Sequence, residues 1–128
     1  MRLLLDTHAL LWFATGNRAF SPAARVQTSD PANEVLVSHA SAWELAIKTS
    51  LGKLRLDRDL SLWLKRYVAG NGFDDLPISL DHVVGVARLP HHHGDPFDRL
   101  LVAQCQTERL ALVSRDPVFD AYAIRRVW

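Results

Sequence analysis

The chain has 128 residues, enough for one domain with a substantial core and too few for two, so we expect a single domain over residues 1–128. Hydrophobic residues make up 48% of the chain and charged residues 23%, as is usual for soluble globular proteins. A formal net charge of +1 excludes a global attraction to nucleic acid or membranes, and the single cysteine, Cys105, excludes an intrachain disulfide and a cysteine-based zinc site.

The N-terminal apolar run does not predict targeting or membrane insertion. Asp6 and His8 interrupt it, and it lacks the layout of a signal peptide. No apolar stretch reaches the roughly 18 residues that a membrane span needs. We therefore expect a cytoplasmic protein without membrane contact.

Short apolar runs alternate with helical patterns along almost the whole chain. Capping residues, prolines and glycines set most of the expected boundaries. In chain order we expect a strand at 3–5, helices at 8–14 and 21–28, a strand at 35–37, a helix that reaches residue 50 and is capped by either Ser38 or Ser41, a helix at 60–69, a strand at 76–78, helices at 79–89 and 96–109, a strand at 110–113, a short helix at 117–122 and a strand at 123–127. This alternation predicts an α/β domain with a mostly parallel sheet and helices on both faces.

Two acidic residues directly follow expected strands. Asp6 comes after the first apolar run, and Asp116 comes soon after the run that ends at Val113. Each could simply cap the helix that follows it. In parallel α/β sheets, however, binding sites form outside the carboxyl ends of the strands, where both residues would lie.

Glu44 lies within the helix expected to reach residue 50. At 100° per residue, Ala40, Trp43, Ile47 and Leu51 form an apolar stripe, and Glu44 falls on its edge. The alternative is an exposed pair between Glu44 and Lys48, four residues later, worth about 0.3–0.5 kcal/mol.

Asp98 is the third residue of the strong helix expected to start at Pro96, with Asp95 as its natural N-cap. A capping arrangement with a favourable helix dipole would account for it, at about 1 kcal/mol. However, Asp98 also shares one helix face with Leu101, Val102 and Cys105, and this face is apolar. A carboxylate at the head of a buried stripe needs a cation, a donor or a proton. Cys105 on this face is expected to be a buried, unreactive thiol.

The four acids would converge at one edge of such a sheet. Carboxylates within a few ångströms of each other repel, and their pKa values rise. A hard divalent cation relieves the repulsion, and Mg²⁺ suits one or two direct carboxylates with others bonded through water. The expected chemistry is metal-assisted phosphodiester hydrolysis.

Four sequence blocks carry a family resemblance: LLLDTHALLW, SAWELAIK, DPFDRLLVAQ and LVSRDPVFDAY. In this order and spacing they resemble PIN-domain ribonucleases, and more closely the VapC-type toxins of bacterial toxin–antitoxin modules. The resemblance runs from Leu3 to the end of the chain. It implies a PIN-like three-layer α/β/α sandwich with a mostly parallel sheet of four or five strands.

The resemblance also implies an activity, an Mg²⁺-dependent endoribonuclease in which Mn²⁺ can substitute. It implies an acidic catalytic and metal-binding quartet, with Asp6 and Asp98 as direct ligands. The supporting hydroxyls would be Thr7 and Ser114. The implied partners are an RNA substrate, a VapB-type antitoxin and a second copy of the chain in a homodimer. The residues of that quartet are Asp6, Glu44, Asp98 and Asp116.

Further residues allow more than one interpretation. Arg99 and Arg115 flank two of the acids and could contact RNA phosphates or pair with those acids. The His91-His92-His93 loop could touch the RNA backbone or respond to pH, since consecutive ligands do not easily converge on one metal ion. An apolar groove for the antitoxin could involve the aromatic residues Trp12, Phe13, Trp63 and Tyr67.

Two alternative functions remain open from the sequence. One is another Mg²⁺-dependent phosphate hydrolase, and the other is a catalytically inactive PIN-like interaction module. The residues Asp6-Thr7-His8 lack the Asp-x-Asp of a dehalogenase-like phosphatase, and no glycine-rich phosphate loop is present. An inactive module would show no carboxylate-dependent affinity for Mg²⁺ or Mn²⁺.

Overall fold

A five-stranded parallel sheet with the order β3-β2-β1-β4-β5 forms the centre of the computed structural model, which describes all of residues 1–128. The strands are β1 (Arg2–Leu5), β2 (Glu34–Ser38), β3 (Asp74–Leu76), β4 (Ala111–Val113) and β5 (Arg126–Val127). The α-helices are α1 (Thr7–Thr15), α2 (Pro22–Ser29), α3 (His39–Ser50), α4 (Leu60–Tyr67), α5 (Leu80–Ala87) and α6 (Pro96–Glu108), and η1 (Ala69–Asn71) and η2 (Pro117–Ala121) are 3₁₀ turns.

The central strand β1 is buried on both of its faces. Leu3, Leu4 and Leu5 are all fully buried, and Leu4 lies in register with Leu36 and Leu112 of the neighbouring strands. Because side chains alternate along a strand, Leu3 and Leu5 enter one hydrophobic cluster while Leu4 enters a second. Continuous apolar runs are typical of parallel strands covered by helices on both sides.

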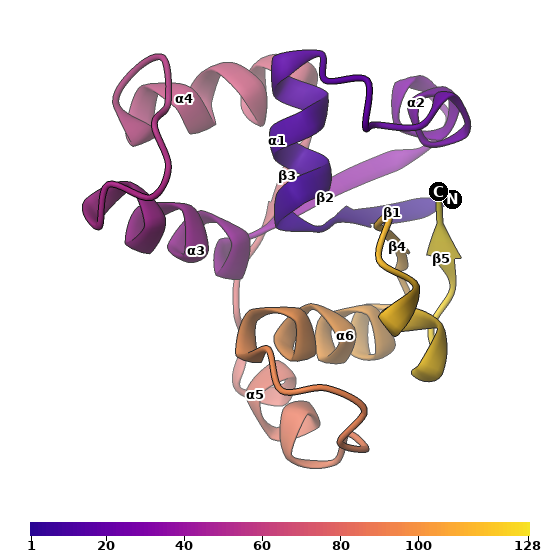
Figure 1. The fold of residues 1–128 in the computed structure, drawn as a ribbon. Coiled ribbons are helices and arrows are strands. Elements are labelled where there is room, and N and C mark those ends of the chain that lie inside the picture. The colour runs from indigo at the N-terminus through magenta and orange to yellow at the C-terminus, as the bar shows by residue number, and fades with distance from the viewer.

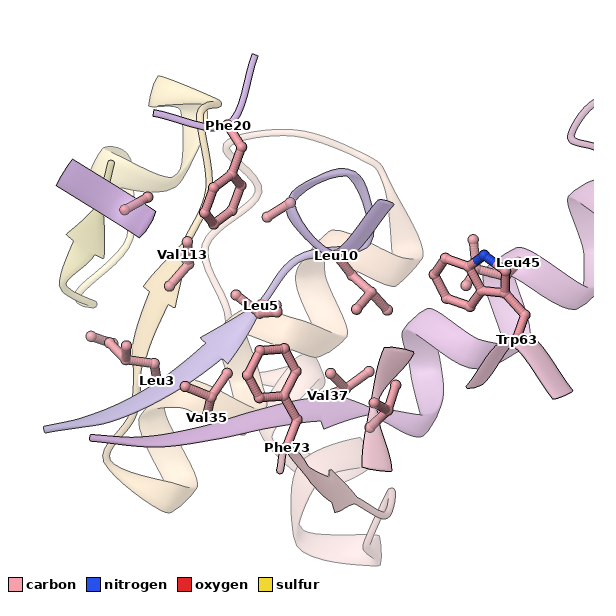
Figure 2. Packing of buried hydrophobic residues seen from close by; sticks show 14 residues of the cluster. Leu3, Leu5, Leu10, Phe20, Val35, Val37, Leu45, Trp63, Phe73 and Val113 are labelled. Carbon is pink, nitrogen blue, oxygen red and sulfur yellow. The ribbon is translucent and has the colours of Figure 1, made fainter. Parts of the chain in front are cut away.

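The helices form the two outer layers of the molecule (Figure 1). Helices α1, α2 and α4 cover the face that carries Leu3 and Leu5, and Figure 2 shows this cluster. Helix α6 covers the opposite face, and α5 packs against α6 on the side away from the strands. Helix α3 contributes Leu45 to the first cluster and Ala40 to the second. The predicted three-layer α/β/α arrangement with a parallel sheet is therefore confirmed, and the sheet has five strands.

Side-chain caps explain where most helices begin. An oxygen of the residue before the helix accepts a backbone N–H of the first turn, which satisfies one otherwise unpaired donor. Prolines at the first position of α2 and α6 favour the same start. The capping residues of α1 to α6, in order, are Asp6, Ser21, Ser38, Asp59, Ser79 and Asp95.

Several predicted boundaries were wrong, among them the end of α5, which lies at Ala87 rather than at residue 89. Strand β3 comprises Asp74–Leu76 rather than residues 76–78, because Pro77 cannot donate to a strand ladder and ends it. The last strand is only Arg126–Val127 rather than residues 123–127. Helix α4 ends at Tyr67 rather than at residue 69, and the 3₁₀ turn η1 follows before Gly72 takes a left-handed conformation.

The predicted aromatic groove does not include Trp63. This side chain is 2% exposed and belongs to the core cluster of α1 to α4 (Figure 2). Trp12, Phe13 and Tyr67 are half-buried and pack against the same cluster. None of the helices combines the length and the apolar character that crossing a membrane requires.

Candidate functional site

The strand order reverses at β1, which places a crevice at the carboxyl ends of β1 and β4. The chain runs from β1 outward to β2 and β3, then returns to the other side of β1 as β4. Asp6 follows β1, and its backbone N–H donates to the carbonyl of Val113 at the end of β4 (3.1 Å). Ser114 and Asp116 follow β4 directly, so both junctions open on the same crevice.

All four predicted acids line one cavity of about 260 Å³ at this crevice. They come from four separate segments: the start of α1, the middle of α3, the first turn of α6 and the start of η2. The complete lining comprises Asp6, Thr7, His8, Glu44, Lys48, Asp95, Asp98, Asp116 and Phe119. Lys48, His8 and Asp95 also line this cavity, although they were not among the predicted site residues.

Asp6 serves both as a helix cap and as a wall of the cavity. Its Oδ1 accepts the N–H of Ala9 at 2.7 Å, so the predicted cap is present. The side chain is nevertheless buried, at 7% exposed. Burial raises the pKa of the Asp6 carboxyl above its usual value, although hydrogen bonds from Ser114 and Ala9 lower the pKa in part. The two interpretations of Asp6 are therefore compatible.

Asp98 lies in the first turn of α6, and the predicted cap at Asp95 is confirmed, since the Asp95 Oδ1 accepts the N–H of Asp98 at 2.9 Å. Burial, followed by the charge of Asp95, raises the pKa of Asp98 to about 6, while a hydrogen bond from His93 lowers the pKa in part. A carboxyl with a pKa near 6 is more readily ionised when a cation is present.

Glu44 lies nearer to the interior than the apolar stripe predicted. The buried residues of α3 are Ala40, Ser41 and Leu45, while Trp43 is 57% exposed and Leu51 62% exposed. The predicted stripe was therefore wrong. The Glu44 side chain is only 12% exposed, and its carboxylate lies 3.0 Å from the Lys48 ammonium. The predicted pair between Glu44 and Lys48 is present, and both members line the acidic cavity.

Two hydroxyl groups brace the crevice. The buried Ser114 Oγ accepts the N–H of Asp116 at 3.1 Å and also lies beside Asp6. The Thr7 hydroxyl donates to the Ser41 Oγ at 3.0 Å and so links α1 to α3. Asp116 itself is exposed, and its Oδ1 accepts the N–H of Val118, which starts η2.

The two arginines flanking the acids have different surroundings. Arg99 is buried, at 6% exposed, and its guanidinium donates to the Pro90 carbonyl (2.8 Å) and the Tyr122 hydroxyl (3.2 Å). This placement contradicts the predicted RNA contact at Arg99, and the guanidinium does not pair with an acid either. Arg115 is exposed and lines a second cavity of about 330 Å³, which shares Asp6, His8 and Asp116 with the first.

The donor set fits a hydrated hard cation. No three His, Cys, Asp or Glu side chains converge closely enough to surround one ion by themselves. A structural zinc site, which needs four protein ligands, does not fit this geometry. Mg²⁺ keeps several waters and binds one or two carboxylates directly, so a cavity lined by four acids with room for water suits it.

The raised pKa of Asp98 predicts a pH dependence of stability in the metal-free protein. Its folded-state pKa of about 6 exceeds the unfolded value, so the folded state binds more protons between about pH 4 and pH 6. The contribution of Asp98 to the free energy of unfolding is therefore largest at low pH and is lost as the pH rises through 6. We therefore compare the free energy of unfolding of Asp98→Asn with that of wild type, measured by urea unfolding in EDTA. This difference should favour the variant by about 1–2 kcal/mol more at pH 6.5 than at pH 4.5. An equal difference at both pH values would contradict this assignment.

Comparisons with solved structures find the same fold in other proteins. No curated protein sequence gives a significant match to the chain. Among solved structures, VapBC2 from Rickettsia felis bound to a promoter DNA fragment superposes with a TM-score of 0.74 at 12% identity, covering 98% of this chain and 97% of that one. FitAcB from Neisseria gonorrhoeae gives a TM-score of 0.63 at 17% identity, covering 97% and 95% of the two chains. A toxin–antitoxin complex from Klebsiella pneumoniae gives 0.60 at 20% identity, covering 90% and 87%.

The sequence of the chain also matches a family model directly. The model is that of the PIN domain, and the match extends over residues 3–125. It includes every strand except the last, with β1 from Leu3 onward, and all four acids of the cavity. A match over nearly the whole length, on a parallel sheet of the expected topology, means that this chain belongs to the PIN domain family.

Proposed function

We propose that the chain is a Mg²⁺- or Mn²⁺-dependent endoribonuclease that acts as the toxin of a VapBC-type toxin–antitoxin module. The observation that carries this proposal is the meeting of four carboxylates from distant segments around one cavity in a PIN domain. Burial raises the pKa values of two of these carboxyls, Asp6 and Asp98, because it disfavours their charged forms. A divalent cation would compensate their charge.

The proposal assigns a role to each acid. Asp6 and Asp98, the two with raised pKa values, would hold the ion, and Glu44 and Asp116 would complete the negative charge and orient water. When bound, the ion would polarise the scissile phosphate and lower the pKa of a water molecule. Ser114 supports Asp6 and Asp116 from the interior, and Thr7 fixes α1 against α3.

The second cavity offers a path for the RNA chain. Arg115 and Trp12 line it, and it adjoins the acidic cavity through Asp6 and Asp116. An exposed guanidinium beside the carboxylates can bind a neighbouring phosphate, and an indole offers a face for a base. Arg115 therefore remains our proposed RNA contact.

The proposed partners follow from the same family assignment. The similar solved structures include toxin–antitoxin complexes, which supports a VapB-type antitoxin as partner. Exposed apolar side chains on α5, namely Leu80, Val83 and Val84, support a homodimer. The RNA substrate and antitoxin imply a cytoplasmic site of action. Light scattering after size-exclusion chromatography measures the dimer, and suppression of cleavage by the product of a short neighbouring reading frame tests the antitoxin.

The direct test is cleavage of purified cellular RNA by the wild-type protein. We expect discrete fragments with Mn²⁺ or Mg²⁺ and intact RNA with EDTA, since the acids alone provide no electrophile. A phosphate monoester assayed in parallel addresses the other hydrolase class. Cleavage of the monoester alone would favour that class, and no carboxylate-dependent metal binding would favour an inactive PIN-like module.

A further inference from the structure

The three consecutive histidines before α6 do not share one environment. His91 and His92 are exposed, whereas the His93 side chain is only 18% exposed and turns toward the acidic cavity. Its Nε2 lies 3.3 Å from Oδ2 of Asp98. Its Nδ1 lies 2.7 Å from the hydroxyl of Tyr122, a residue that is 4% exposed. His93 therefore connects the interior to an acid of the proposed metal site.

The direction of these hydrogen bonds follows from the third member of the chain. Arg99 has only donors, so its Nη1 donates to the Tyr122 oxygen at 3.2 Å. The Tyr122 hydroxyl has a single hydrogen, and His93 Nδ1 is its available acceptor. His93 Nδ1 therefore accepts, and the ring hydrogen lies on Nε2, where it donates to Asp98.

The same guanidinium also fixes the loop that carries His93. Arg99 donates to the carbonyl oxygens of Pro90 at 2.8 Å and Leu89 at 3.4 Å. It is buried at the start of α6, next in sequence to Asp98. One helix turn thus provides both the acid and the anchor for the imidazole that contacts it.

Only one oxygen of Asp98 is held in this way. Oδ2 receives the His93 hydrogen bond, whereas Oδ1 accepts no hydrogen bond from the protein. A donor on one oxygen fixes the carboxylate plane and leaves the other oxygen available to a cation. Hydrogen-bonded partners of metal-binding carboxylates typically change metal affinity by roughly 10–100-fold when removed.

We propose that His93 is a positioning residue, locked by Tyr122 and Arg99 in the Nε2–H form to orient the Asp98 carboxylate toward the cation. This inference rests on the proposed function, because it names the group that sets the geometry of one proposed metal ligand. It replaces the two interpretations of the histidine loop, RNA contact and pH response, with a role inside the site for His93 alone.

The first test uses no metal. Imidazole ¹⁵N NMR of the protein in EDTA should show His93 in the Nε2–H form. The exposed His91 should instead show a mixture of the Nδ1–H and Nε2–H forms. Tyr122→Phe, which deletes only the hydroxyl, should remove the fixed tautomer of His93. Two results would overturn the proposal. One is the Nδ1–H form at His93 in the wild-type protein, and the other is a His93 signal in Tyr122→Phe that is identical to the wild-type signal.

The second test measures Mn²⁺ affinity by calorimetry and cleavage at saturating Mn²⁺. We expect His93→Ala to weaken Mn²⁺ binding by roughly 10–100-fold and His93→Gln to restore part of it, because a glutamine amide can also donate. His91→Ala is the matched control and should bind like wild type. Thermal unfolding of each variant shows whether it is folded.

The outcomes separate the two proposals. If wild type binds Mn²⁺ and cleaves RNA but His93→Ala matches His91→Ala, the positioning role is overturned and the proposed function stands. If wild type itself shows no carboxylate-dependent Mn²⁺ binding, the proposed function fails and the positioning role fails with it.

Discussion

Replacing Asp98 with Asn is expected to reduce RNA cleavage at fixed Mn²⁺ by roughly 100-fold or more. The change keeps the size of the side chain and removes one negative charge from a cavity whose proposed ion needs that charge. Loss of a hydrogen-bonded partner alone typically costs roughly 10–100-fold, so loss of a direct ligand should cost at least as much. Initial rates on a short synthetic RNA measure the effect, and calorimetry measures the accompanying loss of Mn²⁺ affinity.

The fold should survive this substitution. Asp95, not Asp98, caps α6, and the Asp98→Asn change relieves the burial of a charge. Asp81→Asn removes a charge of the same kind from the exposed first turn of α5 and should leave cleavage within about twofold, since surface changes of this kind act weakly. Equal rates for wild type and Asp98→Asn would remove Asp98 from the proposed ligands.

Much of the site could be predicted because topology alone places it. Residues that follow parallel strands on either side of a reversal in strand order must meet, so Asp6 and Asp116 are drawn together whatever their side chains do. Asp98 could be found because it interrupts an otherwise apolar helix face. The helix caps that were predicted as alternative explanations are also present, at Asp6, Asp95 and Asp116, and they coexist with the site.

Apolar periodicity failed on α3 because two of its three buried residues, Ala40 and Ser41, are small and one of these is polar. Ser41 is buried through its hydrogen bond with Thr7, which no hydropathy pattern reports. Trp43 instead packs edge to face on Phe97 near the surface, with ring centroids 5.2 Å apart. Glu44 is consequently more buried than its predicted position on the edge of the apolar stripe suggested.

Long-range partners explain what the sequence could not predict around α6. The role of Arg99 depends on Tyr122, which is 23 residues away, and on carbonyls of an irregular loop. Loop backbones carry no periodicity, so neither the burial of Arg99 nor the inward turn of His93 has a sequence signal. Because Arg99 directly follows Asp98 in the sequence, it was predicted either to contact an RNA phosphate or to pair with an acid. Its guanidinium instead donates to the Pro90 carbonyl and the Tyr122 hydroxyl in the interior.

Replacing Trp63 with Ala is expected to destabilise the protein by about 3–5 kcal/mol. The indole is 2% exposed and lies beside Leu45 in the core cluster (Figure 2). Its ring centroid is 5.0 Å from that of Tyr67. Removing the indole leaves a cavity between α4 and α3 that neighbours can fill only in part. Urea unfolding followed by circular dichroism measures the loss, since this signal does not depend on tryptophan fluorescence.

The adjacent residue offers a matched control that distinguishes a core tryptophan from a groove tryptophan. Leu62 lies on the same helix but is 57% exposed, so Leu62→Ala should change the free energy of unfolding by no more than about 0.5 kcal/mol. If Trp63 instead lined an antitoxin groove, as its aromatic spacing first suggested, Trp63→Ala would weaken antitoxin binding and leave stability near that of Leu62→Ala. A typical domain has a free energy of unfolding of only about 5–15 kcal/mol, so the loss predicted for Trp63→Ala would remove a large part of the stability of the protein.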